Sequence, residues 1–225
     1  MAVYLSVIRV EGNEVQLLGA RASRGAPALV EALEAVAEHD TPEQREEALR
    51  ATVESLLGQM KTRPLAFVLC LPAHRVVTRL IRVPFKGRSQ VAQAVPVELE
   101  PHLPFPVDEL ALDFTVVRPM EDETEVLAFG MRQNALDERM APLVELEASP
   151  EAAIPDTAGL TALWLAVHRR TRDAAVVVHL CRESCVFTFL KDRKICFTRA
   201  IPMTGADAVA SPEALARELR NTMRS

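Results

Sequence analysis

Few side chains in this chain have the type and spacing that chemistry requires. The most suggestive group is His179, Cys181 and Cys185, because imidazole and thiolate are ligands that Zn²⁺ prefers in proteins. These residues lie at alternating positions of a strand-like run, with no turn between them to make the side chains converge. The pattern therefore favours an ordinary strand, and we predict no metal there.

Other catalytic patterns are missing from the sequence. It contains no glycine-rich phosphate loop, dinucleotide fingerprint, paired-histidine metalloprotease motif or nucleophile elbow. Glu98 and Glu100 are two residues apart, so a helix would not place them on one face. We assign them to a surface rather than to acid–base catalysis. The sequence predicts that the chain is not an enzyme.

Composition narrows the class of protein further. The net charge is −5, which argues against nucleic acid as a partner, because phosphate binding needs an excess of Lys and Arg. The apolar run 65–73 is too short to span a bilayer, and the first residues do not resemble a signal peptide. No two cysteines form a Cys-x-x-Cys pair, which is typical of free thiols in a reducing compartment. We expect a cytoplasmic protein.

Strand and helix patterns are mixed along the chain. Strands are predicted at 2–10, 14–22, 65–71, 76–83, 110–117 and 125–131, and later at 174–181, 185–190 and 195–201. Helices are predicted at 27–38, 41–61 and 134–147, in the acidic segment before residue 103, after residue 156 and after Ser211. The helix after residue 156 should bury one face, formed by Leu160, Leu163, Trp164 and Val167. The order of elements after about residue 174 repeats the order at the start, so we predict two lobes, 1–150 and 151–225.

One stretch, 83–117, carries most of the information. The acidic segment Val97-Glu98-Leu99-Glu100 precedes the proline corner Leu103-Pro104-Phe105-Pro106, and an alternating strand follows. The two prolines fix two φ angles and remove two backbone N–H hydrogen-bond donors, so the corner cannot belong to a helix or a central strand. This order resembles the cytoplasmic actin-like domain of GspL proteins of type II secretion and of PilM proteins of type IV pilus assembly.

The resemblance implies a fold and a location. The fold would be α/β and actin-like, with two ribonuclease-H-like lobes of mixed sheets flanked by helices. The strands that normally finish the second lobe do not follow the last helix here, so that lobe is expected to be incomplete. The location would be the cytoplasmic face of the inner membrane, and we expect a fragment or a shortened relative of a membrane-anchored protein.

The resemblance also bears on nucleotide binding. Actin-like proteins hold metal-bound phosphates with two hairpins, each carrying an Asp and a Gly. The matching positions here are Ser6 and Ile8 in the first hairpin, and His179 and Cys181 in the second. Both acids and both glycines are replaced. We therefore predict no bound cofactor and no ATP hydrolysis, which points to the GspL branch.

Partners follow from the resemblance as well. They would be the N-terminal domain of a GspE-type secretion ATPase and the proteins of the inner-membrane platform, with a homodimer as a further option. The candidate partner surface consists of Glu98, Glu100, Phe105, Asp108 and Glu109. Phe105 would be its apolar anchor and the acids would steer a basic partner. The alternative is that Phe105 only packs the corner onto the sheet.

Three functions remain open from sequence. The leading hypothesis is a non-catalytic scaffold of a type II secretion platform that couples an ATPase to membrane components. The second is an ATP-binding, PilM-like protein of type IV pilus assembly, or a related kinase-like ATPase. The third is an interaction module of another pathway that has kept only the fold.

Overall fold

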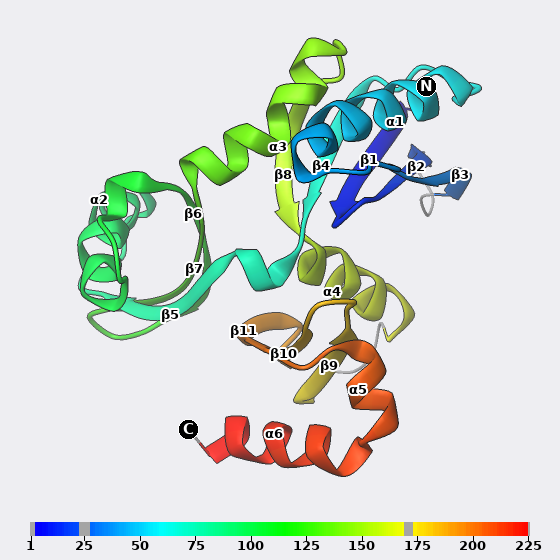
Figure 1. Cartoon of the computed structure of the whole chain (residues 1–225). Coiled ribbons are helices and arrows are strands. Elements are labelled where there is room, and N and C mark those ends of the chain that lie inside the picture. The colour runs from blue at the N-terminus through cyan, green and yellow to red at the C-terminus, as the bar shows by residue number, and fades with distance from the viewer. Residues whose placement is uncertain (1–2, 23–27, 169–172, 225) are drawn as a thin grey trace. The chain divides into compact units, whose positions relative to one another are not determined.

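The computed structural model describes residues 3–22, 28–168 and 173–224, and its contacts divide the chain into two compact units. The first unit comprises 1–72 and 134–155, and the second comprises 73–133 and 156–225. The chain therefore passes from one unit to the other three times (Figure 1). Within the described ranges, no helix combines the length and the apolar character that a membrane crossing requires.

The first unit is built on a five-stranded sheet in the order β3-β2-β1-β4-β8. Its strands are β1 Val3–Glu11, β2 Glu14–Ala22, β3 Ala28–Val36, β4 Ala66–Leu71 and β8 Pro150–Pro155. The first three strands pair antiparallel, as the predicted hairpin requires, whereas β4 pairs parallel with both β1 and β8. Ile8, Leu17 and Leu69 are fully buried and form part of its core.

The predicted helix at 27–38 is wrong, because its described part forms β3. Residues 28–36 pair antiparallel with β2, from Glu14↔Val36 to Arg21↔Ala28. The segment is rich in Ala, Leu and Glu, which favour helices when no tertiary partner is present. The open edge of β2 supplies a ladder of backbone hydrogen bonds, and this ladder overrides the local preference.

Helices of the first unit are α1 Arg45–Gln59 and α3 Gln133–Glu145, and α1 packs on β2 and β3. A 3₁₀ turn, Pro42–Gln44, precedes α1. The side-chain oxygen of Gln44 accepts hydrogen bonds from the backbone N–H groups of Asp40 (3.2 Å) and Thr41 (3.3 Å). This is the returning half of a capping box, and it marks the start of the helix predicted at 41–61.

One sheet of the second unit has the order β5-β7-β6, with all pairs antiparallel. Its strands are β5 Val77–Val83, β6 Leu110–Pro119 and β7 Thr124–Arg132. The predicted acidic helix is α2 Arg88–Leu99, which packs over this sheet through Val91, Val95 and Leu99 (Figure 1). Short 3₁₀ turns, Glu100–His102 and Val107–Glu109, flank the proline corner.

The other sheet of the second unit is a meander of the three strands predicted at 174–181, 185–190 and 195–201, in the order β11-β10-β9. Its strands are β9 Ala175–Leu180, β10 Cys185–Lys191 and β11 Lys194–Ile201. Three helices belong with it, namely α4 Asp156–Val167, α5 Gly205–Ala210 and α6 Pro212–Arg224. Helix α5 was not predicted, although Thr204 caps it by accepting a hydrogen bond from the Asp207 N–H group at 3.1 Å.

The apolar face predicted for α4 is not buried as a whole. Leu163 and Val167 are 62% and 69% exposed. The buried residues of α4 are instead Asp156, Thr157 and Thr161. The prediction failed because helical spacing identifies a stripe but not the neighbour that would cover it.

The compact units do not coincide with the consecutive lobes expected from sequence. Residues 73–133 lie with 156–225, and β8 completes the sheet of the first unit. A parallel β4–β8 pair joins strands that are separated by the whole 73–133 segment, and local patterns carry no sign of such a pairing. The division into lobes 1–150 and 151–225 stays a prediction.

Candidate functional site

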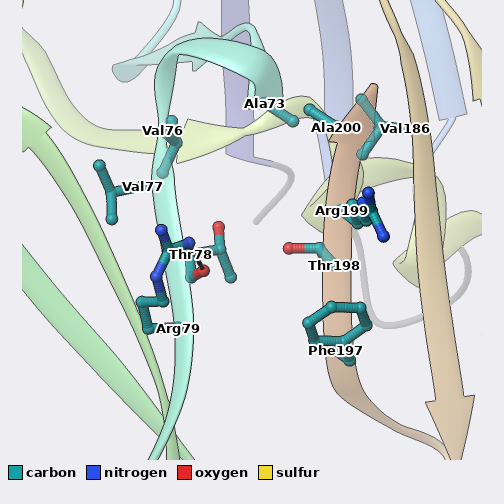
Figure 2. A pocket seen from close by; sticks show the side chains of 10 residues that line it. All are labelled: Ala73, Val76, Val77, Thr78, Arg79, Val186, Phe197, Thr198, Arg199 and Ala200. Carbon is teal, nitrogen blue, oxygen red and sulfur yellow. Dashed lines mark hydrogen bonds between the residues drawn. The ribbon is translucent and has the colours of Figure 1, made fainter. Parts of the chain in front are cut away.

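A pocket of about 360 Å³ lies in the second unit and is lined by two edge strands. One wall comes from β5 with the preceding turn Ala73–Arg75, and the other from β11 with Val186 of β10. Figure 2 shows Thr78 and Thr198 pointing toward each other from opposite walls. Sequence patterns gave no signal for this pocket, because its walls come from segments far apart in the chain.

Both walls are edges of their sheets. Among the described strands, β5 pairs with β7 alone and β11 pairs with β10 alone. An edge strand keeps one row of backbone N–H and C=O groups available for another strand. The pocket therefore combines open backbone edges with apolar, hydroxyl and arginine side chains, which suits an extended peptide.

The first pair of predicted phosphate positions lies inside the sheet of the first unit. Ser6 and Ile8 are both fully buried in the middle of β1. The Ser6 hydroxyl donates to the backbone carbonyl of Leu18 at 3.4 Å. Side chains held inside a sheet in this way are not presented to a ligand.

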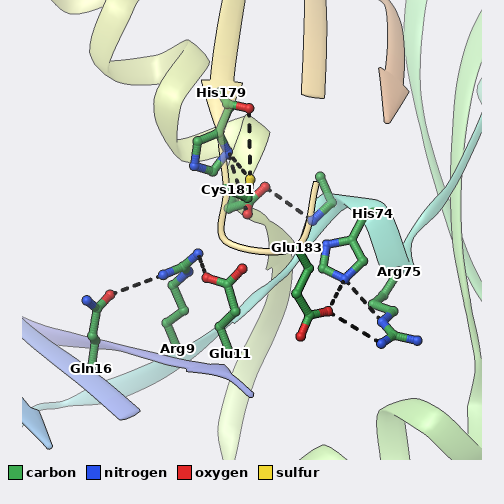
Figure 3. A network of polar contacts seen from close by, with 10 residues as sticks. Arg9, Glu11, Gln16, His74, Arg75, His179, Cys181 and Glu183 are labelled. Carbon is green, nitrogen blue, oxygen red and sulfur yellow. Dashed lines mark hydrogen bonds and ion pairs between the residues drawn. The ribbon is translucent and has the colours of Figure 1, made fainter. Parts of the chain in front are cut away.

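The turn that follows β1 is tight. Glu11 pairs with Glu14, so only Gly12 and Asn13 form the turn, and Gly12 has the positive φ of 60° that favours glycine. Arg45 of α1 donates to the Gly12 carbonyl at 2.7 Å. Arg9 forms an ion pair with the buried Glu11 (Figure 3). The β1–β2 hairpin is therefore regularly paired on both sides of Ser6 and Ile8, from Val3 to Glu11.

The second pair of predicted positions lies close to a third residue. His179 is in β9 and Cys181 follows that strand, so the two side chains share one face. Cys181 Sγ lies 3.3 Å from His179 Nδ1, and Asp156 Oδ2 of α4 lies 3.7 Å from the same nitrogen. Figure 3 shows the His179 ring turned toward Cys181. The sequence pattern indicated only that a helix begins after residue 156.

Cys185 does not belong to this group. It is fully buried in the cluster with Phe187 and Ile201, and its thiol donates to the Thr204 carbonyl at 3.7 Å. Burial raises the pKa of the Cys185 thiol, and the nearby Asp207 carboxylate raises this pKa further. A thiol that stays protonated is a poor metal ligand.

Backbone contacts fix the loop that carries Cys181. Its N–H group donates to the Ser184 carbonyl at 2.8 Å, and its carbonyl accepts from the Gly205 N–H group at 2.7 Å. A Cβ at Gly205 would lie 2.8 Å from that carbonyl, so the close approach requires glycine. Glu183 also pairs with His74 at 3.3 Å and with Arg75 at 3.6 Å (Figure 3). The loop is therefore held from two sides.

The predicted partner surface lies at the end of α2 and along the corner that follows. Glu100, Asp108 and Glu109 are exposed, and Glu98 is half-buried. Phe105 packs against the core cluster that includes Val83, Val91 and Val126. The Arg132 guanidinium lies over the Phe105 ring, 4.2 Å from its centroid. This packing favours the structural alternative for Phe105, and the partner role stays a prediction.

Comparisons with known proteins place the chain in a family. A family model described as type IV pilus assembly protein PilM matches residues 26–210. No curated protein sequence matches the chain.

Solved structures show the fold. The structure titled PilM-PilN type IV pilus biogenesis complex matches with a TM-score of 0.75 and 23% identity, over 95% of this chain and 65% of the other. This chain thus spans about two thirds of the chain that it matches. The cytoplasmic domain of EpsL, an inner-membrane component of the type II secretion system of Vibrio cholerae, matches with a TM-score of 0.57 and 14% identity, over 88% and 71%.

A Bacteroides thetaiotaomicron protein with an actin-like ATPase fold matches with a TM-score of 0.52 and 9% identity, over 96% and 77% of the two chains. These likenesses establish the actin-like fold that the sequence predicts. The predicted kinship with GspL and PilM proteins is also confirmed, since the family model covers most of the sequence. The chain belongs to the family of the type IV pilus assembly protein PilM.

Proposed function

We propose that this protein is a non-catalytic scaffold on the cytoplasmic side of a bacterial inner membrane, where it links an assembly ATPase to membrane components of a pilus-type or secretion-type machine. The observation that carries the proposal is the match of residues 26–210 to the PilM family. The likeness to a PilM-PilN complex supports a membrane-anchored partner of the PilN kind. The family model is that of a pilus assembly protein, and one structural match is a component of a secretion system, so the proposal includes both kinds of machine.

The pocket between β5 and β11 is the surface that suits this partner best. An extended segment could add to either open strand edge through main-chain hydrogen bonds, while pockets between side chains select its sequence. Val76 and Val186 provide a buried apolar floor, and Thr78 and Thr198 provide hydroxyls. We assign the pocket to a cytoplasmic segment of the PilN-like partner.

Filling the pocket should weaken partner binding. Thr78→Trp places a large ring between the two walls, so we expect the dissociation constant for a PilN-like partner to rise at least about tenfold, a loss of about 1.4 kcal/mol or more. The measurement is biolayer interferometry with the full chain and the partner encoded beside it.

A matched control keeps this test specific. Thr115→Trp introduces the same side chain at an exposed position of β6 in the same sheet, away from the pocket lining. This variant should bind the partner as the unmodified chain does. If Thr78→Trp bound the partner as tightly as Thr115→Trp and the unmodified chain, the partner would bind elsewhere on the protein.

ATP should bind negligibly. Ser6 and Ile8 are buried in β1, and His179 and Cys181 replace the Asp and Gly that a phosphate hairpin needs. Calorimetry with millimolar Mg-ATP should give no saturable heat. A dissociation constant in the micromolar range would contradict the scaffold proposal and would favour the ATP-binding alternative.

The candidate partner surface, formed by Glu98, Glu100, Phe105, Asp108 and Glu109, remains our proposed docking surface for the ATPase. Its carboxylates at Glu100, Asp108 and Glu109 are exposed and can steer a basic domain toward it. Charge reversal there should act mainly on the association rate and on its dependence on salt.

A further inference from the structure

Three potential metal ligands meet in the second unit, outside the pocket described above. They are Asp156 Oδ2, His179 Nδ1 and Cys181 Sγ, and all of these atoms lie within 4.8 Å of one another. Asp156 and Cys181 are buried, with 7% and 5% exposure. The His179 side chain is 20% exposed, so the group can be reached from solvent.

We propose that these three side chains bind one Zn²⁺ ion. A tetrahedral Zn²⁺ with ordinary bond lengths to sulfur, nitrogen and oxygen separates its ligand atoms by about 3.3–3.6 Å. The two distances to His179 Nδ1, 3.3 Å from sulfur and 3.7 Å from oxygen, already lie close to this range. Three protein ligands leave the fourth position to water.

The donor types select the metal. A thiolate, an imidazole and a carboxylate together suit Zn²⁺ or Co²⁺, whereas Mg²⁺ requires oxygen ligands. His179 and Cys181 stand where the actin-like pattern has an Asp and a Gly. The two replacements that we predict to remove phosphate binding therefore supply a nitrogen and a sulfur donor at this place.

A Cys–His–Asp catalytic triad does not fit the same residues. In a triad the nucleophile contacts one ring nitrogen and the acid contacts the other. Here Cys181 Sγ and Asp156 Oδ2 both approach Nδ1. Three donor atoms within 4.8 Å of one another, on three different side chains, are close enough to be drawn around one ion.

Other contacts hold the ligands in place, as second-layer contacts do in metal sites. The Ala73 N–H group donates to Asp156 Oδ1 at 3.2 Å, which fixes the carboxylate while Oδ2 faces His179. The backbone of Cys181 is fixed by Ser184 and Gly205. A bound ion would tie the start of α4 to the β9–β10 hairpin within the second unit.

Metal content and spectroscopy test the site in the full chain. Purified protein that has been stripped with chelator and dialysed should take up one equivalent of Zn²⁺ by mass spectrometry of the metal. Co²⁺ in its place should give a thiolate-to-metal charge-transfer band in the near ultraviolet and the strong visible bands of a tetrahedral site. A large excess of Mg²⁺ should displace neither ion.

Variants assign the ligands. Cys181→Ser and Asp156→Asn should each weaken Zn²⁺ binding, measured against a chromophoric chelator, by roughly 100-fold or more, because each removes a ligand directly. Cys196→Ser is the matched control, since it also removes one thiol but lies outside the group. It should retain the affinity and the cobalt spectrum. Circular dichroism establishes that each variant is folded, and Asp156→Asn, which keeps the shape of the side chain, serves if Cys181→Ser unfolds.

The proposal predicts a third result. Chelator should lower the melting temperature of the unmodified protein and of Cys196→Ser, but not that of Cys181→Ser. A cobalt spectrum without a thiolate band, equal loss of binding in Cys196→Ser, or displacement by Mg²⁺ would each overturn the assignment. Absence of Zn²⁺ uptake by folded, reduced protein would do the same.

Discussion

Replacing Phe187 with alanine should lower the free energy of unfolding of the second unit by about 3–5 kcal/mol. Phe187 is the largest fully buried side chain of the described residues, in the middle of β10. Helix α6 contributes Leu215 and Leu219 to the cluster around it. Truncation would leave a cavity that this closely packed cluster can fill only in part, so the full cost of a large-to-small change applies.

The chain carries its own probes for this measurement. Its single tryptophan, Trp164, lies in α4 of the second unit, and its single tyrosine, Tyr4, lies in β1 of the first. A urea titration monitored by Trp164 fluorescence should show the lower free energy of unfolding of Phe187→Ala. Phe85→Ala, at a ring that is 40% exposed, should cost no more than about 1 kcal/mol. A similar loss in both variants would mean that Phe187 does not anchor the core.

Replacing Phe105 with alanine should also destabilise the second unit, by about 2–3 kcal/mol, which is less than for a fully buried ring. The ring packs against the cluster beneath α2 and lies under the Arg132 guanidinium. A double-mutant cycle with Arg132→Ala should assign about 0.5–1 kcal/mol to the cation–π contact. No coupling between the two residues would contradict the stacked geometry.

The same substitution tests the docking surface. If Phe105 also anchors the ATPase, binding should weaken by roughly 1–3 kcal/mol, mostly through faster dissociation, at temperatures where the variant stays folded. Glu100→Lys should leave stability unchanged and slow association, because Glu100 is exposed. Unchanged affinity in both folded variants would move the interface away from this corner.

Much of the fold could be predicted from local signals. The hairpin around Gly12, the helix start at Thr41 and the corner at Pro104 each depend on a few neighbouring residues with restricted backbone conformations. The meander of β9, β10 and β11 followed from strand periodicity and turn residues. These features need no knowledge of distant partners.

Features that depend on distant partners could not be predicted. β3 has a helical composition and becomes a strand only because β2 offers a free edge. The face of α4 that is buried depends on its neighbours, and Leu163 and Val167 lie outside that face.

The candidate sites show the same difference between local and distant signals. The sequence pattern drew attention to His179 and Cys181 because they share one strand face. Asp156 is the first residue of α4, the helix that precedes β9 in the chain, so strand spacing could not connect it with them. The expectation of no metal considered Cys185 in place of Asp156, and Cys185 proved to be a core residue. The pocket between Thr78 and Thr198 exists only after two sheets have formed.

The threefold passage of the chain between its units has a consequence for biosynthesis. The sheet of the first unit receives its fifth strand, β8, only after residues 73–133 have left the ribosome. Those residues in turn emerge before 156–225, with which they form the second unit. The first unit can therefore be completed only after residues 73–133 of the second unit have been made, and no single cut in the chain releases one unit whole.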